Sequence, residues 1–216
     1  MKSIYLTTLG LLLLFSSLAA AYPGGTFCAL QKSSDNNPFV TKARERIRDR
    51  FGPPLANPTI VNFQTAEDNW PFTFNPYGST HFLPWKTCVV FGPKGQSVDV
   101  VAHELMHAEL VERVGYWQRL MHIPTWFDEG LAMQVDDRVR YRNFPNLLSH
   151  DDTMRLDSAA EFYVSDPDSL TQHYASVRHT MTELLRDPHV VFNHLGTFSS
   201  FDSLWQSISH DESERL

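Results

Sequence analysis

The chain has 216 residues, of which 42% are hydrophobic and 20% are charged, and its formal net charge is −7. This composition supports a buried core and excludes the high charge and low hydrophobicity that are typical of disorder. It also argues against a nucleic-acid-binding protein, because phosphate binding needs clustered Lys and Arg, and the sequence has no evident cluster of that kind.

Residues 1–21 predict a secretory signal peptide. Lys2 precedes an apolar stretch over residues 4–21 that ends on three alanines. This is the pattern of a leader that is cleaved, here after Ala21. The alternative is an uncleaved membrane anchor, because 18 residues are just long enough to span a bilayer. We therefore expect residues 22–216 to form one exported domain, secreted or periplasmic, that is not stably inserted in the membrane and whose oligomeric state is left open.

Cys28 and Cys88 are the two cysteines of the chain. In an exported protein an even pair predicts a disulfide bond rather than two free thiols. Two thiols also cannot form a cysteine-rich zinc site, so a metal would have to be held by histidines and carboxylates.

Hydrophobic spacing and turn residues predict the elements in chain order. Asn37 followed by Pro38 predicts the start of a helix, whose apolar residues repeat at helical spacing as far as Phe51. The next predicted elements are a short buried strand over residues 59–64, an ordered loop or hairpin over residues 66–79, and a second strand over residues 87–91.

The rest of the chain is predicted to be mainly helical. Helices are expected to start at Ser97 and Thr125, at capping boxes over residues 158–161 and 169–172, and at an apolar stripe over residues 201–208. The predicted fold class is therefore α+β, with a small N-terminal sheet followed by a helical C-terminal half.

An H-E-x-x-H string over residues 103–107 carries the chemistry. In a helix, four residues bring His107 back to within about 40° of His103, so both imidazoles leave one face. Glu104 lies about 60° further round, where its carboxylate can reach water at a metal without ligating the metal. The alternative is an exposed helix face with two histidines. The apolar residues beside the histidines favour burial, and zinc would compensate a buried His-His-Glu group.

A catalytic zinc site usually has three protein ligands and one open position. The segment W-F-D-E-G-L-A over residues 126–132 offers Glu129 as the third ligand. We expect Thr125 to cap a helix that places Glu129 in its first turn, and Gly130 to allow the close approach of another backbone or a ligand. The alternative for Glu129 is a carboxylate that only complements the helix dipole.

The two motifs together, with 21 residues between His107 and Glu129, resemble the gluzincin branch of zinc peptidases and within it the peptidase MA-like group. This resemblance implies a zincin-like fold with Zn²⁺ held by His103, His107 and Glu129. It implies that Glu104 is the general base of peptide-bond hydrolysis. It also implies that residues 87–91 are an edge strand, packed on the active-site helix, along which an extended peptide pairs.

Gluzincins also tend to place a tyrosine or a histidine on a later helix to stabilise the oxyanion. Tyr174 resembles that tyrosine, and a half-buried helix tyrosine is the alternative. His122, His173 and His179 are expected to be surface or satisfied histidines. The sequence therefore predicts an exported zinc metallopeptidase that acts on peptides or proteins. The alternatives are an exported zinc-binding or adaptor protein without turnover, and a helical binding module in which the string is accidental.

Overall fold

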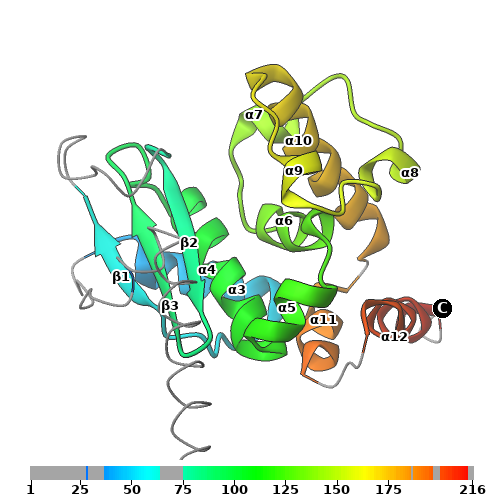
Figure 1. Cartoon of the computed structure of the whole chain (residues 1–216), viewed down its shortest axis with the longest axis horizontal. Helices are drawn as coiled ribbons and strands as arrows, with labels where there is room; N and C mark the ends of the chain where they lie inside the picture. The colour runs from blue at the N-terminus through cyan, green and yellow to red at the C-terminus, as the bar shows by residue number, and fades with distance from the viewer. Residues whose placement is uncertain (1–27, 29–36, 64–74, 186, 197–199, 214–216) are drawn as a thin grey trace, which may run out of the picture.

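A computed structural model of the protein has an α+β fold and describes Cys28 and residues 37–63, 75–185, 187–196 and 200–213. One small sheet lies beside a larger group of helices (Figure 1). The predicted signal peptide lies outside the described residues, as does most of the predicted loop over residues 66–79. Among the helices of the described residues, none is both long enough and apolar enough to cross a membrane.

The sheet has the strand order β1-β3-β2. The central strand β3 (Lys86–Phe91) pairs in parallel with β1 (Thr59–Asn62) and antiparallel with β2 (Gly78–Leu83). The prediction that residues 87–91 form an edge strand is wrong, because this apolar run is covered by a neighbour on each side. The edge strand next to the helix that carries the H-E-x-x-H string is β2, which begins inside the predicted loop.

Two predicted helices pack against each other, α3 (Val40–Phe51) and α4 (Val98–Val114), and α4 also contacts β2 and β3. Ser97 caps α4 as predicted, since its hydroxyl accepts the Val100 N–H at 3.3 Å. Asn37 does not cap α3. Its side-chain oxygen accepts the N–H two residues on at 2.9 Å, so it forms a turn before a helix that starts later than predicted.

The second motif lies on α6 (Thr125–Met133), which contacts both α4 and α10 (Pro167–Leu184). The prediction that Thr125 caps α6 is wrong. The N-cap is Pro124, which makes no side-chain bond, and Thr125 is the first helical residue. Glu129 is therefore in the second turn, where the attraction of the helix dipole for a carboxylate has already fallen off.

A close approach occurs at Gly130 as expected, but the group that approaches most closely is a side chain of α10 rather than a backbone or a ligand. A Cβ built on Gly130 would lie 2.3 Å from Cγ of Met181, a residue of α10. The missing side chain lets α10 pack directly on α6. The predicted disulfide between Cys28 and Cys88 is also present, with 5.7 Å between the two Cα atoms, and it attaches the segment before α3 to the central strand.

The C-terminal helices agree with the predictions in part. The capping box of residues 158–161 is confirmed and starts α9 (Ala159–Phe162). The box predicted at residues 169–172 is wrong, because Asp166 caps α10 by accepting the Ser169 N–H at 2.8 Å. The predicted last helix is α12 (Phe201–Ser213). The helices that were not predicted are α5 (Tyr116–His122), α7 (Val139–Arg142), α8 (His150–Thr153) and α11 (Pro188–Leu195).

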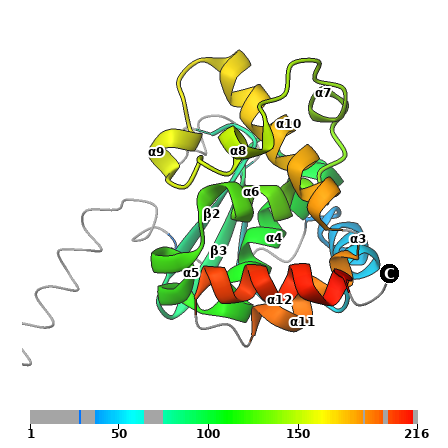
Figure 2. The ribbon, with the colours of Figure 1, turned by 90° about the vertical axis from the view of Figure 1, so that its right-hand side faces the viewer.

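The helices lie on two sides of α6. Figure 2 shows α7 to α10 on one side of it and α11 and α12 on the other. Aromatic rings join α6 to α12, where the buried Trp126 ring lies 5.7 Å from the partly buried ring of Trp205 between centroids. This arrangement buries α6 and keeps its position against α4 fixed.

Candidate metal centre

Three buried side chains from the two motifs converge on one point. Nε2 of His103 lies 3.3 Å from Nε2 of His107 and 3.4 Å from Oε2 of Glu129, and 3.6 Å separates Nε2 of His107 from Oε1 of Glu129. His103, His107 and Glu129 are each only 3 to 6% exposed. The predicted burial of the histidines is confirmed, and the alternative of an exposed helix face is wrong.

The spacing of these atoms fits a tetrahedral cation. Ligand bonds of about 2.0–2.1 Å separate neighbouring ligand atoms by about 3.3–3.4 Å. Oε2 of Glu129 is buried and accepts no hydrogen bond within the described part of the chain. A buried carboxylate oxygen without a donor is costly, and a cation among the three side chains would remove that cost. His103, His107 and Glu129 therefore fit the zinc that the two motifs imply.

The imidazole of His107 is oriented from behind by a carboxylate. Its Nδ1 lies 2.6 Å from Oδ1 of Asp128, whose other oxygen accepts a hydrogen bond from Arg119. Burial alone would raise the pKa of Asp128, but Arg119 and His107 outweigh burial and hold that pKa well below its usual range. Asp128 is therefore an anion, which directs the Nδ1 proton of His107 toward itself and leaves Nε2 for a metal.

The imidazole of His103 has a similar neighbour. Its Nδ1 lies 3.5 Å from Oδ2 of Asp136, which is a buried carboxylate. Arg138 donates its Nε–H to both oxygens of Asp136 at 2.9 Å. Burial would raise the pKa of Asp136, but the Arg138 hydrogen bond and the nearby His103 lower it. Each histidine thus turns Nε2 to the centre and Nδ1 to a carboxylate that an arginine neutralises.

Without a metal, the centre attracts a proton instead. Burial would lower the pKa of His107, but the negative charges of Asp128 and Glu129 raise it to about 9. At neutral pH the metal-free imidazole would be protonated. The carboxylates around His107 therefore favour positive charge near this point, which a divalent cation would supply.

Glu104, the proposed base, is held beside the three ligands by the edge strand β2. Its Oε2 accepts a hydrogen bond from the hydroxyl of Thr80 at 2.7 Å. Gly78 packs so closely that a Cβ built on it would lie 2.9 Å from Cγ of Glu104. Both residues belong to β2, so the edge strand determines where this carboxylate points.

Two tyrosines lie at the centre. The Tyr174 ring is 6.0 Å from that of His103 between centroids, and Tyr163 donates its hydroxyl hydrogen to Oε1 of Glu129. Burial of the hydroxyls, with the charge of Glu129, raises the pKa of both tyrosines well above the usual value. Both phenols therefore remain hydrogen-bond donors at neutral pH. The structure brings Tyr174 to the predicted site.

No protein-family model, curated protein or solved structure matches the chain. The sequence analysis missed the residues that surround the candidate ligands: Arg119, Asp136, Arg138 and Tyr163. No spacing rule identifies them, because each is brought to the centre by the fold. The sequence indicated Asp128 only as the residue next to Glu129, without a role at the centre.

The other histidines agree with the prediction. His122 is exposed, His173 bonds the Phe162 carbonyl at 2.8 Å through Nδ1, and His179 is exposed and pairs with Glu183 at 3.2 Å. None of the three belongs to the group of side chains that could hold a metal within the described residues. Their roles are those of surface and satisfied histidines.

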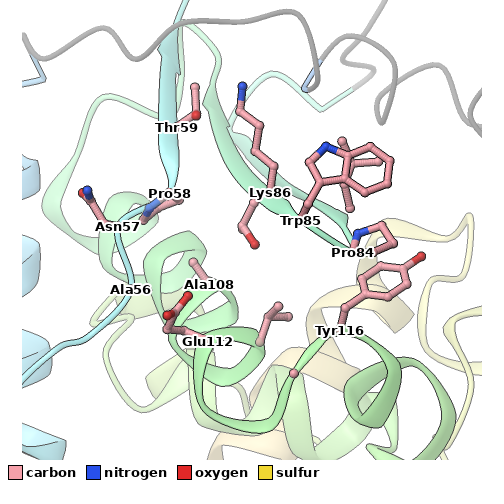
Figure 3. Close-up of a pocket in the computed structure, with 14 residues that line it drawn as sticks. Ala56, Asn57, Pro58, Thr59, Pro84, Trp85, Lys86, Ala108, Glu112 and Tyr116 are labelled. Carbon is pink, nitrogen blue, oxygen red and sulfur yellow. The ribbon is translucent and has the colours of Figure 1, made fainter.

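The centre opens into a cavity of about 200 Å³, lined by the three ligands, Glu104, both tyrosines and residues of β2. A separate cavity of about 410 Å³ lies between the turn after β2 and the C-terminal end of α4, where Trp85, Lys86 and Glu112 lie around it (Figure 3). It shares no lining residue with the cavity of the metal centre. The residues of the candidate metal centre therefore line the smaller of these two cavities.

Proposed function

We propose that the protein is an exported zinc-dependent metallopeptidase of the gluzincin type. His103, His107 and Glu129 would be its zinc ligands, and Glu104 its general base. The observation that carries the proposal is the position of Glu104, a carboxylate outside the ligand group that faces the same cavity and is held by a hydrogen bond. A purely structural zinc site needs no such residue.

The side chains suit hydrolysis of a peptide bond. Zinc, when bound, polarises a carbonyl and lowers the pKa of water. Glu104 takes the proton of the attacking water and passes it to the leaving amine. Because Thr80 bonds Oε2 of Glu104, Oε1 is left to receive that proton. Tyr174 donates a hydrogen bond to the oxygen that becomes negative, since the hydroxyl of Tyr163 is already bonded to Glu129.

The edge strand β2 suits an extended substrate. Within the described residues β2 pairs with β3 only, so β2 is an edge strand to which an extended peptide would add. Residues of β2 also line the cavity of the metal centre. A peptide that pairs with β2 would therefore pass the three ligands, in the role that the resemblance had assigned to residues 87–91.

The experiment that tests this proposal compares the parent protein with Glu104→Gln. The zinc-loaded mature proteins are incubated with a proteome-derived peptide library, and new termini are identified by mass spectrometry. We expect the parent to cleave peptides. Glu104→Gln should retain one zinc per chain and cleave nothing, because a neutral amide cannot accept the proton from water. A parent that is fully loaded with zinc and inactive on every peptide would support the zinc-binding or adaptor alternative.

A further inference from the structure

A larger cavity, of about 450 Å³, adjoins the metal centre at the start of β2. Its walls include His103, Glu104 and Tyr174, which also line the cavity of the metal centre, and Tyr77, which directly precedes β2. The volume is within the range of about 300–1,000 Å³ that is usual for ligand clefts. A group bound there would therefore lie next to a peptide at the zinc ligands.

Two arginines line this cavity, but only one is neutralised. Arg138 is paired with Asp136. Arg140 is exposed and forms no ion pair with any carboxylate of the described residues. In a protein whose formal net charge is −7, this guanidinium faces the cavity without a carboxylate partner among the described residues. It is therefore open to an anion that enters the cavity.

The guanidinium of Arg140 is held in place by aromatic rings. It lies 4.5 Å from the centroid of Tyr141 and 5.4 Å from that of Tyr77, and it donates one hydrogen bond to the Tyr141 hydroxyl. Stacking on rings fixes the plane of a guanidinium while its other N–H groups stay available. Those groups form a planar fork that matches the two oxygens of a carboxylate.

We propose that this cavity is a subsite for a carboxylate of the peptide substrate. Arg140 would be the residue that binds the carboxylate, and Arg138 would add positive charge. The carboxylate belongs either to an Asp or Glu side chain or to the free C-terminus of the peptide. This subsite rests on the proposed peptidase function, and it makes the enzyme selective for acidic peptides or for sites near a C-terminus.

Arg142 offers a matched control for Arg140. It lies on the same helix, its side chain is 53% exposed, and it is not among the residues that line the cavity. Arg138 is less suitable for substitution, because its loss would also free Asp136, which faces His103. The informative variants are therefore Arg140→Gln and Arg142→Gln.

The test measures binding to zinc-loaded Glu104→Gln protein, which does not consume the ligand. The ligands are labelled alanine pentapeptides with Glu or Gln at each position in turn, each with a free or an amidated C-terminus. We expect Arg140→Gln to weaken the binding of peptides that carry the carboxylate about tenfold, as for loss of a charge-assisted hydrogen bond. The affinity for their neutral counterparts should not change. Arg142→Gln should change neither.

The pattern of the loss identifies the source of the carboxylate. If Arg140→Gln removes only the preference for Glu peptides over the matching Gln peptides, the subsite binds an acidic side chain. If it removes only the preference for a free over an amidated C-terminus, the subsite binds the C-terminal carboxylate. Equal affinities for all peptides, or equal losses in Arg140→Gln and Arg142→Gln, would overturn the subsite. If the parent cleaves nothing while Arg140 still selects carboxylates, the peptidase proposal fails and the binding site stands.

Discussion

Nδ1 of His107 lies 2.6 Å from Oδ1 of Asp128, the residue directly before the proposed ligand Glu129. Removing the charge of such a carboxylate typically lowers metal affinity by about 10- to 100-fold. We therefore expect Asp128→Asn to lower zinc affinity by this factor, measured by competition with a chromophoric chelator. Asp151→Asn, at an exposed position on α8, is the control and should bind zinc as the parent does.

Gly78→Ala tests the contact between β2 and the proposed base. The added methyl group would lie 2.9 Å from Cγ of Glu104, so either the strand or the Glu104 side chain must move. We expect turnover to fall while zinc content stays at one per chain. Gly196→Ala is the control, because φ is −80° there and no atom lies within 4 Å of the new Cβ. Parent-like turnover in Gly78→Ala would show that this contact does not position Glu104.

Replacement of each of the two tyrosines by Phe should have a different effect. Tyr174→Phe removes a donor to the oxyanion, and we expect turnover to fall by about 10² to 10³ with zinc affinity unchanged. Tyr163→Phe removes the hydrogen bond to Glu129, so it should change zinc affinity as well as turnover. Steady-state kinetics and zinc titration of both variants separate these effects. Unchanged turnover in Tyr174→Phe would make Tyr174 a half-buried helix tyrosine and nothing more.

The sequence was sufficient to predict the helices that carry the metal centre. His103 and His107 are four residues apart on a helix whose start is marked by Ser97, so local spacing alone brings their side chains to one face. Glu129 required the second motif, because only the packing of α6 on α4 brings it to the histidines. Gly130, which the sequence did mark, instead allows α10 to pack closely on α6.

The strand β2 could not be predicted in the same way. Its sequence G-S-T-H-F-L lacks the alternation of apolar and polar residues. Of its polar residues, Thr80 bonds the proposed base, while Ser79 and His81 bond each other. The same is true of Asp136 and Arg138, whose roles depend on contacts across the fold. The edge-strand assignment failed because an apolar run such as β3 fits a central strand better than an edge.

The bond between Cys28 and Cys88 predicts a loss of stability on reduction. It closes a loop with a sequence separation of 60, for which the chain-entropy model gives about 4 kcal/mol. We expect reduction to lower the free energy of unfolding by about this amount. Denaturant unfolding of the reduced and unreduced proteins measures the difference. Thiol titration of the denatured, unreduced protein should find no free thiol, and two reactive thiols per chain would contradict the bond.

The most direct test of the central claim is the zinc stoichiometry of the mature protein and of four single variants. Elemental analysis and chelator competition should give one zinc per chain for the parent and for Glu104→Gln. His103→Ala, His107→Ala and Glu129→Ala should each bind zinc much more weakly and lose the stabilisation that the metal adds. A parent that binds no zinc, or a Glu129→Ala variant that binds it as tightly as the parent, would contradict the account.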